Sequence, residues 1–357
     1  MQKRFTGFWI LLKRSFILQD SNIILGVGIR GTGQVALQHI IAIQKNPNAQ
    51  VVAICGRDLD KVKTIIKNFN LRAKGYVNYE DMLLDVNVDI VSECMPNYLH
   101  ADEAILAFKA GKHLILEKPA GINREQTDKI LQASKESGKL GVCSLVLRWH
   151  PLVCNIKKLL KQNAFGDVYF VQTDYWHGIK KDFSSYSWIR KKEFAGGAMI
   201  TGGCHAVDIS RYLNGEITEV FAYKNKNRDD FDYDTTYNAT VKFENGSLGR
   251  ISATLDGVAF PYQFNIDLLG KEGAIRGNKF YSNKLIENQN DWCVLPCETP
   301  DSGSVNHHPF SDEINNLING ILNEEEIICP IEDACKSMNA VYAIMESADT
   351  GKPVFVR

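Results

Sequence analysis

The sequence predicts an α/β protein built from a doubly wound parallel sheet and a following α/β domain with a large open, mostly antiparallel sheet. Three observations carry this prediction. An apolar strand runs through a glycine turn into a helix over residues 23–45, and strands and helices then alternate up to residue 144. Between residues 217 and 270, strand-like segments follow one another without helices. Alternation favours a parallel sheet, and consecutive strands favour an antiparallel or mixed one.

The first strand, residues 23–29, is apolar and leads into the motif Gly31-x-Gly33-x-x-Ala36. Gly31 permits a sharp turn, and Gly33 lets the main chain approach a ligand closely. Ala36 is small enough for the helix at 35–45 to pack on the strand. Free N–H groups and the dipole at the start of that helix favour a pyrophosphate. The pattern is typical of dinucleotide binding, although an ordinary glycine turn after a buried strand looks similar.

The second strand, residues 50–55, ends at Gly56 and Arg57. An acidic residue here, about 20 residues after the glycine motif, would bond the ribose 2′-hydroxyl of NAD. A glycine followed by a guanidinium suits the 2′-phosphate of NADP instead. We therefore expect NADP or NAD as the cofactor, with NADP slightly favoured. In the alternative interpretation, Arg57 stacks on the adenine ring and either cofactor binds.

The rest of the first domain continues the alternation. We expect helices at 61–69, 79–84, 101–110 and 124–136, and strands at 89–94, 113–116 and 139–144. Ligands of parallel sheets bind beyond the carboxyl ends of the strands, where Gly31, Gly56, Pro96 and Lys118 all lie. Lys118 follows a buried strand directly and precedes Pro119. A lysine held there beside a bound cofactor is suited to proton transfer.

The second domain begins near the segment Arg148–Pro151. We expect a helix at 152–162, a strand at 167–176, a helix that opens within 196–208 and continues to 213, strands at 217–224, 234–244, 247–256 and 262–270, and helices at 309–322 and 331–349. Asn245-Gly246 indicates a tight hairpin turn, and residues 278–306 are expected to be irregular.

The predicted boundaries are an N-terminal extension at 1–21, a cofactor domain at 22–147, and a second domain at 148–357. The last helix and the tail of the chain are expected to pack back on the first domain.

Composition excludes several classes of protein. The 357 residues are 45% hydrophobic and 23% charged, which is ordinary for a globular protein. A formal net charge of −1 argues against nucleic-acid binding, because phosphate recognition needs a basic surface. The nine cysteines are scattered and odd in number, which indicates reduced thiols and a cytoplasmic location. The apolar stretch at 5–12 is shorter than the roughly 20 residues of a membrane span. We expect no membrane partner, with surface contact of this extension as the alternative.

Several short motifs occur in a fixed order along residues 22–357. They are Gly31-x-Gly33-x-x-Ala36-x-x-His39, Pro96-Asn97-x-x-His100, Glu117-Lys118-Pro119, Gly202-Gly203-Cys204-His205-Ala206-Val207-Asp208 and Gly351-Lys352-Pro353-Val354. In this order the chain resembles the Gfo/Idh/MocA family of sugar and cyclitol oxidoreductases. The resemblance implies a Rossmann domain and an α/β domain whose open sheet forms the substrate wall. It also implies a homo-oligomer, a dimer or a tetramer, assembled through that sheet.

The resemblance assigns roles to particular residues. Lys118 resembles the family's catalytic lysine and His205 its catalytic histidine, and one of them is expected to accept the substrate proton. Thr201 stands where many members have an aspartate, and Asp208 is expected to orient His205. The residues expected at the cofactor are Gly31, Gly33, Gln34, Val35, Gly56, Arg57, Met95, Pro96, Asn97, His100, Glu117 and Lys118. Those expected at the substrate are Arg148, Trp149, Tyr175, His177, Trp188, Thr201, His205 and Asp208.

The implied function is NAD(P)-dependent hydride transfer to or from a hydroxyl or keto carbon of a sugar, glycoside or cyclitol. Two alternatives share the same residues: a glycosidase that acts through transient oxidation by bound NAD, and a sugar-sensing protein without chemistry. Cys293, Cys297, His307 and His308 are residues of the types that bind zinc. Their spacing is loose and lacks a second close pair, so no metal is expected, and His307 and His308 are expected in a loop near the substrate mouth.

Overall fold

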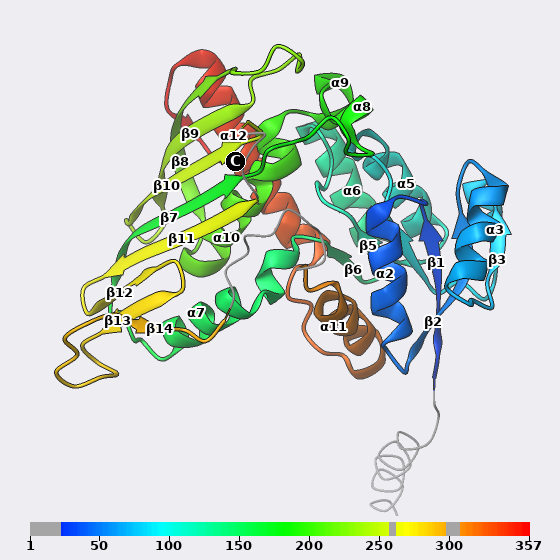
Figure 1. Cartoon of the computed structure of the whole chain (residues 1–357), viewed down its shortest axis with the longest axis horizontal. Helices are drawn as coiled ribbons and strands as arrows, with labels where there is room; N and C mark the ends of the chain where they lie inside the picture. Colours follow the sequence, from blue (N-terminus) through cyan, green and yellow to red (C-terminus); the bar gives the residue numbers. More distant parts are fainter. Residues whose placement is uncertain (1–22, 257–261, 298–307) are drawn as a thin grey trace, which may run out of the picture.

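Two sheets organise the fold, and the long helix α12 (Ile331–Thr350) runs between the second sheet and the first domain (Figure 1). The computed structural model describes residues 23–256, 262–297 and 308–357. The predicted extension at 1–21 lies outside this part of the chain. Within the described residues, no helix is both long enough and apolar enough to cross a membrane.

The first sheet has six strands in the order β3-β2-β1-β4-β5-β6, and every neighbouring pair is parallel. Its strands are β1 (Leu25–Arg30), β2 (Ala49–Cys55), β3 (Lys74–Tyr76), β4 (Ile90–Glu93), β5 (His113–Leu116) and β6 (Gly141–Cys143). All residues of β1 are buried, as expected for a central strand covered on both faces. The predicted doubly wound parallel sheet is therefore confirmed.

The helices of this domain lie close to their predicted positions. They are α2 (Gln34–Gln44), α3 (Leu59–Asn68), α4 (Tyr79–Leu83), α5 (His100–Lys109) and α6 (Arg124–Ser137), with the short 3₁₀ turns η1 (Asn97–Leu99) and η2 (Val146–Trp149). Helix α2 buries Ala36, Ile40 and Ile43 on one face, as expected for an amphipathic helix packed on a sheet. The edge strand β3 was missed, because its three residues, Lys-Gly-Tyr, contain no apolar run.

The second sheet has nine strands in the order β14-β13-β12-β11-β7-β10-β9-β8-β15. They are β7 (Val168–Trp176), β8 (Ile217–Asn225), β9 (Thr236–Phe243), β10 (Leu248–Thr254), β11 (Gln263–Gly270), β12 (Gly273–Arg276), β13 (Lys279–Ser282), β14 (Cys293–Val294) and β15 (Val354–Phe355). Only β7 and β10 pair in parallel, so the sheet is mostly antiparallel, as predicted. The Asn245-Gly246 turn joins β9 to β10 as a hairpin.

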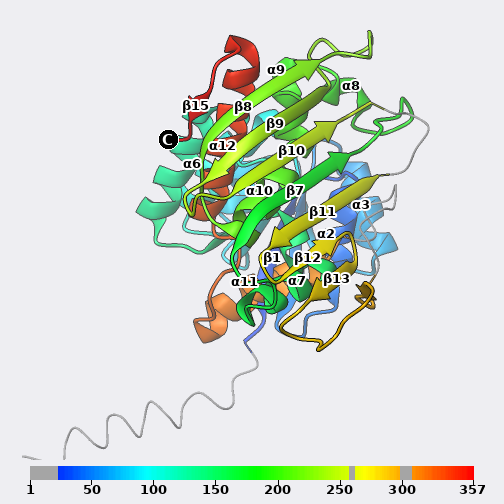
Figure 2. The ribbon, with the colours of Figure 1, turned by 90° about the vertical axis from the view of Figure 1, so that its left-hand side faces the viewer.

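Helices cover one face of this sheet, and Figure 2 shows the other face without helices. The helices of this part of the chain are α7 (Pro151–Lys161), α8 (Tyr186–Ile189), α9 (Lys192–Ala195), α10 (Cys204–Asn214), α11 (Phe310–Asn323) and α12. Helix α10 packs on β7, where the Thr173 hydroxyl bonds both Ala206 O and Ser210 Oγ. The π-helical turn η3 (Met199–Gly203) precedes α10, so the predicted helix opens with a different backbone geometry.

Two predictions are wrong. Residues 278–306 were expected to be irregular, but their described part contains β13 and β14, whose few residues form short pairings with weak patterns. The tail of the chain was expected on the first domain, whereas β15 pairs with β8 of the second sheet. Helix α12 itself contacts both domains: Tyr342 bonds Thr127 Oγ1 at 2.8 Å in the first, and Ser347 Oγ accepts the Ala222 N–H at 3.0 Å in the second.

Candidate active site

A cavity of about 560 Å³ lies where the carboxyl ends of the parallel strands meet the second domain. All the residues predicted at the cofactor line this cavity. On the opposite side it is lined by the predicted substrate residues Tyr175, His177, Trp188, Thr201 and His205. The fold therefore brings together two sets of residues that lie far apart in the sequence.

The glycine turn forms the floor of the cavity. Gly31 has a φ of +119°, and a Cβ there would lie 2.7 Å from Cys94 O, so only glycine fits between the ends of β1 and β4. Gly33 begins α2 without a side-chain cap, and a Cβ there would meet no atom within 4 Å. The first N–H groups of α2 thus lie beside open space. This arrangement fits the pyrophosphate of a dinucleotide.

The end of β2 carries two cations. Arg57 and Lys61 line the cavity next to Gly56. The nearest acidic residue along the chain, Asp58, caps α3 by accepting from the main-chain N–H groups of Asp60 at 2.9 Å and Lys61 at 3.1 Å. Its carboxylate is thus engaged by the helix. This end of the cavity suits an anionic group.

The ends of β4 and β5 are linked by a buried histidine. His100 Nδ1 lies 2.8 Å from Pro119 O, and His100 Nε2 lies 2.7 Å from Met95 O. Glu93 accepts the Met95 N–H at 3.0 Å and places its second oxygen 3.7 Å from His100 Nε2. Burial raises the pKa of Glu93 to about 7, and the charge of His100 opposes that rise.

Lys118 reaches from the first domain to the second. Its Nζ donates to Thr201 O at 3.0 Å. The Thr201 hydroxyl donates to Ala195 O at 3.0 Å and accepts from Asn97 Nδ2 at 3.2 Å. The bond from Asn97 links the two domains through Thr201. Because the proton and a lone pair of its hydroxyl are both used in these bonds, Thr201 does not replace chemically the aspartate that many family members have at this position. Lys118 is left with N–H bonds that can face the cavity.

His205 lies near the start of α10 and faces aromatic side chains. Its ring stacks on Tyr175 with centroids 5.6 Å apart, and it lies 6.4 Å from the His308 ring at 22°. The Tyr175 hydroxyl lies 3.2 Å from His177 Nδ1. Gly202 makes the stack possible, because a Cβ there would lie 2.3 Å from the Tyr175 ring. Burial raises the pKa of Tyr175, so the phenol keeps its proton and can donate to a ligand.

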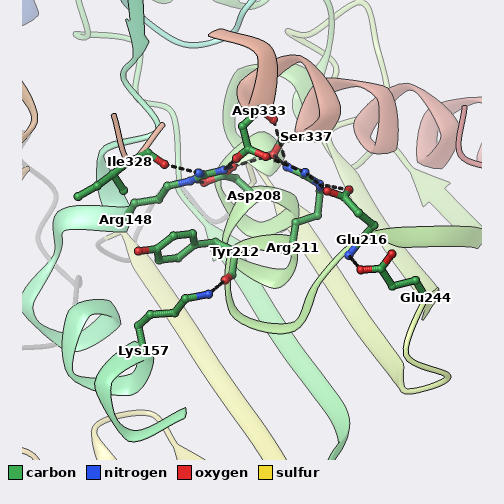
Figure 3. A network of polar contacts seen from close by, with 10 residues as sticks. All are labelled: Arg148, Lys157, Asp208, Arg211, Tyr212, Glu216, Glu244, Ile328, Asp333 and Ser337. Atoms are coloured by element: carbon green, nitrogen blue, oxygen red, sulfur yellow. Dashed lines mark hydrogen bonds and ion pairs between the residues drawn. The ribbon is translucent and has the colours of Figure 1, made fainter. Parts of the chain in front are cut away.

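Arg148, Trp149 and Asp208 do not line the cavity, and their expected contact with the substrate is corrected. Arg148 donates to both Asp208 oxygens, at 2.9 and 2.5 Å, and also contacts Asp333 at 2.5 Å (Figure 3). Trp149 is buried outside the cavity. Arg148 and Asp208 face each other and not the cavity because of tertiary packing. Their charges neutralise one another in the interior, where an unpaired charge would be costly.

The Arg148–Asp208 pair belongs to a larger network that fixes α10. Ser337 on α12 donates to Asp208 at 2.7 Å, and Arg211 on α10 bonds Ser337 at 2.6 Å and Glu216 (Figure 3). The network joins η2, α10 and α12. Asp208 therefore orients the helix that carries His205, and it does so from outside the cavity.

Sequence reasoning missed several lining residues. They are Thr32, Lys61, Cys94, Ser144, Val146, Ile179, Phe183, Ser184, Ser185, Ile189, Leu255 and Phe310. Lys61 carried a usable signal, since it lies in the first turn of the helix that follows Arg57. Phe310 carried none, because only the packing of α11 on the first domain brings it to His39, with ring centroids 4.7 Å apart.

Cys293, Cys297 and His308 do not form a zinc site in the part of the chain that the structure describes. His307 lies outside them, and His308 lines the cavity. Across 23–256, 262–297 and 308–357, no group of three or more His, Cys, Asp or Glu residues is placed to hold a metal ion.

Comparison with known proteins identifies both domains. Residues 25–144 match the Gfo/Idh/MocA domain described as "Oxidoreductase family, NAD-binding Rossmann fold". Residues 157–356 match the domain described as "Oxidoreductase family, C-terminal alpha/beta domain". The chain is similar to trans-1,2-dihydrobenzene-1,2-diol dehydrogenase of Xenopus tropicalis, with 29% identity over 195 residues. That alignment covers 54% of this chain and 58% of the relative, so it spans little more than half of either.

Two further relatives match almost the whole chain. D-xylose 1-dehydrogenase (NADP(+)) 2 of Haloferax volcanii is 23% identical over 334 residues, which cover 92% of this chain and 98% of that protein. The WlbA dehydrogenase of Bordetella pertussis, solved with NADH and UDP-GlcNAcA, superposes with a TM-score of 0.83 at 23% identity. That match covers 95% of this chain and 99% of the solved one, and it shows the shared fold.

Proposed function

Because the chain belongs to the Gfo/Idh/MocA oxidoreductase family, we propose that it is an NAD(P)-dependent dehydrogenase or reductase of a sugar, glycoside or cyclitol. One observation carries the proposal. A single cavity is lined by all the predicted cofactor residues and also by Lys118 and His205. Relatives named as dehydrogenases of xylose and of a cyclic diol support a substrate with a secondary hydroxyl group.

The cofactor domain fits NADP somewhat better than NAD. The N-terminus of α2 would hold the pyrophosphate, and Arg57 and Lys61 would face a 2′-phosphate. Asp58, the acidic side chain nearest this strand end, is engaged as the cap of α3. When bound, the nicotinamide ring supplies the hydride chemistry that amino acid side chains lack.

The side chains on the other side of the cavity, together with Lys118, hold the substrate and move its proton. Lys118 is anchored on Thr201 O and directs its remaining N–H bonds at the substrate oxygen. His205 is 2% exposed and is fixed on α10, so it approaches from the second domain. One of the two accepts the hydroxyl proton while the carbinol hydrogen leaves as a hydride. Tyr175, His177 and Trp188 supply aromatic faces and hydrogen-bonding groups suited to a polyhydroxylated ring.

The proposed assembly is a dimer or a tetramer that forms through the open face of the second sheet. Figure 2 shows this face without covering helices. Light scattering on the purified full chain is expected to give a mass of two or four subunits. A monomer at micromolar concentration would contradict this part of the proposal.

The test of function uses the purified chain with NAD⁺ or NADP⁺ against a panel of pentoses, hexoses, anhydro sugars, cyclitols and cyclic diols. We expect reduced cofactor to accumulate with at least one compound, and the Lys118→Ala variant to lose that signal. Hydrolysis of glycosides by protein that never releases its cofactor would identify the glycosidase alternative. Saturable sugar binding without cofactor reduction would identify a sensing protein. Both outcomes would overturn the proposal.

A further inference from the structure

His100 is a buried histidine whose two ring nitrogens both face carbonyl oxygens. It is the first residue of α5 and is 1% exposed. Nδ1 lies 2.8 Å from Pro119 O, beyond β5, and Nε2 lies 2.7 Å from Met95 O, beyond β4. We call these contacts the His100 bridge. The proposed mechanism gives this residue no chemical role.

The bridge places strict demands on the protons of the ring. A main-chain carbonyl can only accept a hydrogen bond, whereas a neutral imidazole carries one donor and one acceptor nitrogen. With a single proton, one ring nitrogen would point its lone pair at a carbonyl oxygen at hydrogen-bond distance. Changing the tautomer only moves this fault to the other carbonyl. Both bonds form together only when both nitrogens carry a proton.

A counter-charge lies beside the ring. Glu93, on β4, is fully buried, and its Oε2 lies 3.7 Å from His100 Nε2. The other acidic groups that influence this cluster are already paired: Glu103 on α5 with Arg30 at 2.6 Å, and Glu117 after β5 with His39 at 3.1 Å. A buried cation beside a buried carboxylate lowers the cost of burying either charge alone.

We propose that His100 is a doubly protonated imidazolium that ties the loop after β4 to the Lys118–Pro119 turn and so positions Lys118. Pro119, whose carbonyl the ring holds, directly follows Lys118, and the Lys118 ammonium is held separately by Thr201 O. The backbone and the ammonium of the lysine are thus fixed by different domains. His100 is a positioning residue, and this part of the inference rests on the proposed function.

His39 provides a matched control within the same protein. It is also fully buried, but its Nδ1 lies 2.8 Å from the Ser92 hydroxyl, which can donate. Its Nε2 lies 3.1 Å from a Glu117 oxygen, which accepts. A ring with one proton satisfies both partners. Burial alone therefore does not require a second proton on a histidine ring. At His100 the two carbonyl partners require it.

The first test observes the protons directly and needs no activity. The full chain is labelled with ¹⁵N-histidine, and long-range ¹H–¹⁵N spectra are recorded from about pH 5 to about pH 8, the range in which histidines usually titrate. The His100 signals are assigned by their loss in His100→Gln. Both His100 nitrogens are expected to show shifts of the protonated type at neutral pH. If either His100 nitrogen shows a shift of the unprotonated type at neutral pH, the proposal is overturned.

The second test measures the effect on Lys118. In His100→Gln, hydrogen exchange is expected to rise at residues 95–99 and 118–121, while the other described segments keep parental rates. With the substrate found in the panel, kcat is expected to fall between about tenfold and 100-fold, because small misplacements of a catalytic group have such effects. The KM for the substrate is expected to change less than about threefold.

The two tests separate the possible failures. An imidazolium that survives in the spectra while no panel compound reacts would contradict the proposed function and leave the His100 bridge standing. Exchange that rises over the whole first domain, or a kcat equal to that of the parent in a folded His100→Gln protein, overturns the positioning role.

Discussion

The two walls of the cavity are built in different ways. The wall that we propose binds the cofactor, the cofactor wall, consists largely of main chain at the ends of parallel strands, and its glycines and helix N-terminus follow those strands within a few residues. The wall that we propose binds the substrate, the substrate wall, consists of side chains from β7 and the segment after it, α8, η3 and α10, together with residues just before and at the start of α11. A wall of main chain tolerates many side chains and depends on backbone geometry. A wall of side chains depends on distant packing, and this difference separates the expected effects of mutation.

The largest effect is expected where the two walls meet. Lys118→Ala and His205→Ala should each lower kcat by about 10²–10⁴-fold, the usual contribution of general acid–base assistance. In barrier terms this is about 3–5 kcal/mol. Cofactor dissociation constants, measured by fluorescence titration, should change less than about tenfold, since the cofactor wall is untouched. Lys109→Ala, at an exposed position on α5, is the matched control. Near-parental rates in both cavity variants would contradict the site assignment.

The next effect concerns the charged end of the cofactor wall. Arg57→Ala should weaken NADP binding by about 1.5–3 kcal/mol, the value of a charge-assisted hydrogen bond, and should spare NAD. Isothermal titration with both cofactors measures the difference. Equal losses for the two cofactors would assign Arg57 to adenine stacking.

A pair of glycine variants compares the walls directly. Gly33→Ala should keep the stability of the parent, because its Cβ meets no atom within 4 Å, but should weaken cofactor binding. Gly202→Ala should do the reverse. Its Cβ would lie 2.3 Å from the Tyr175 ring, so urea unfolding should show a loss of about 1–3 kcal/mol while cofactor affinity is kept. If both variants lost stability and cofactor binding alike, the two walls would not be independent.

The smallest effect on the site is expected behind the cofactor wall. Glu313 on α11 is fully buried, and desolvation, with Glu117 nearby, raises its pKa well above the usual value. An acid with a raised folded pKa adds stability below its ordinary pKa of about 4.3, and this contribution is lost as pH rises. Glu313→Gln lacks the dependence, so its stability relative to the parent should improve from about pH 5 to about pH 8. Urea midpoints that differ by a constant amount would contradict this assignment.

The same contrast explains what the sequence could predict. Gly31, Gly33, Gly56 and Lys118 lie beside their own strands, so local patterns were enough to place them at the strand ends, where they line the cavity. Arg148 was placed wrongly, because its partners, the buried Asp208 and the partly buried Asp333, lie 60 or more residues away and no local pattern predicts them. His308 was expected near the mouth of the site, whereas Phe310 was missed because α11 reaches the cavity only through tertiary packing. The short strands β3 and β14 were not predicted, because segments of two or three residues carry no periodicity.

The most direct test of the central claim is the double variant Lys118→Ala/His205→Ala, measured with the substrate from the panel. If the two walls place these residues on one substrate oxygen, they act as a unit, and groups that act as a unit are not additive. The double variant should then be only slightly less active than the less active of the two single variants, and its cofactor affinity should be kept. Losses that multiply, so that the double variant falls by the product of both single effects, would show that Lys118 and His205 act independently and would contradict the account.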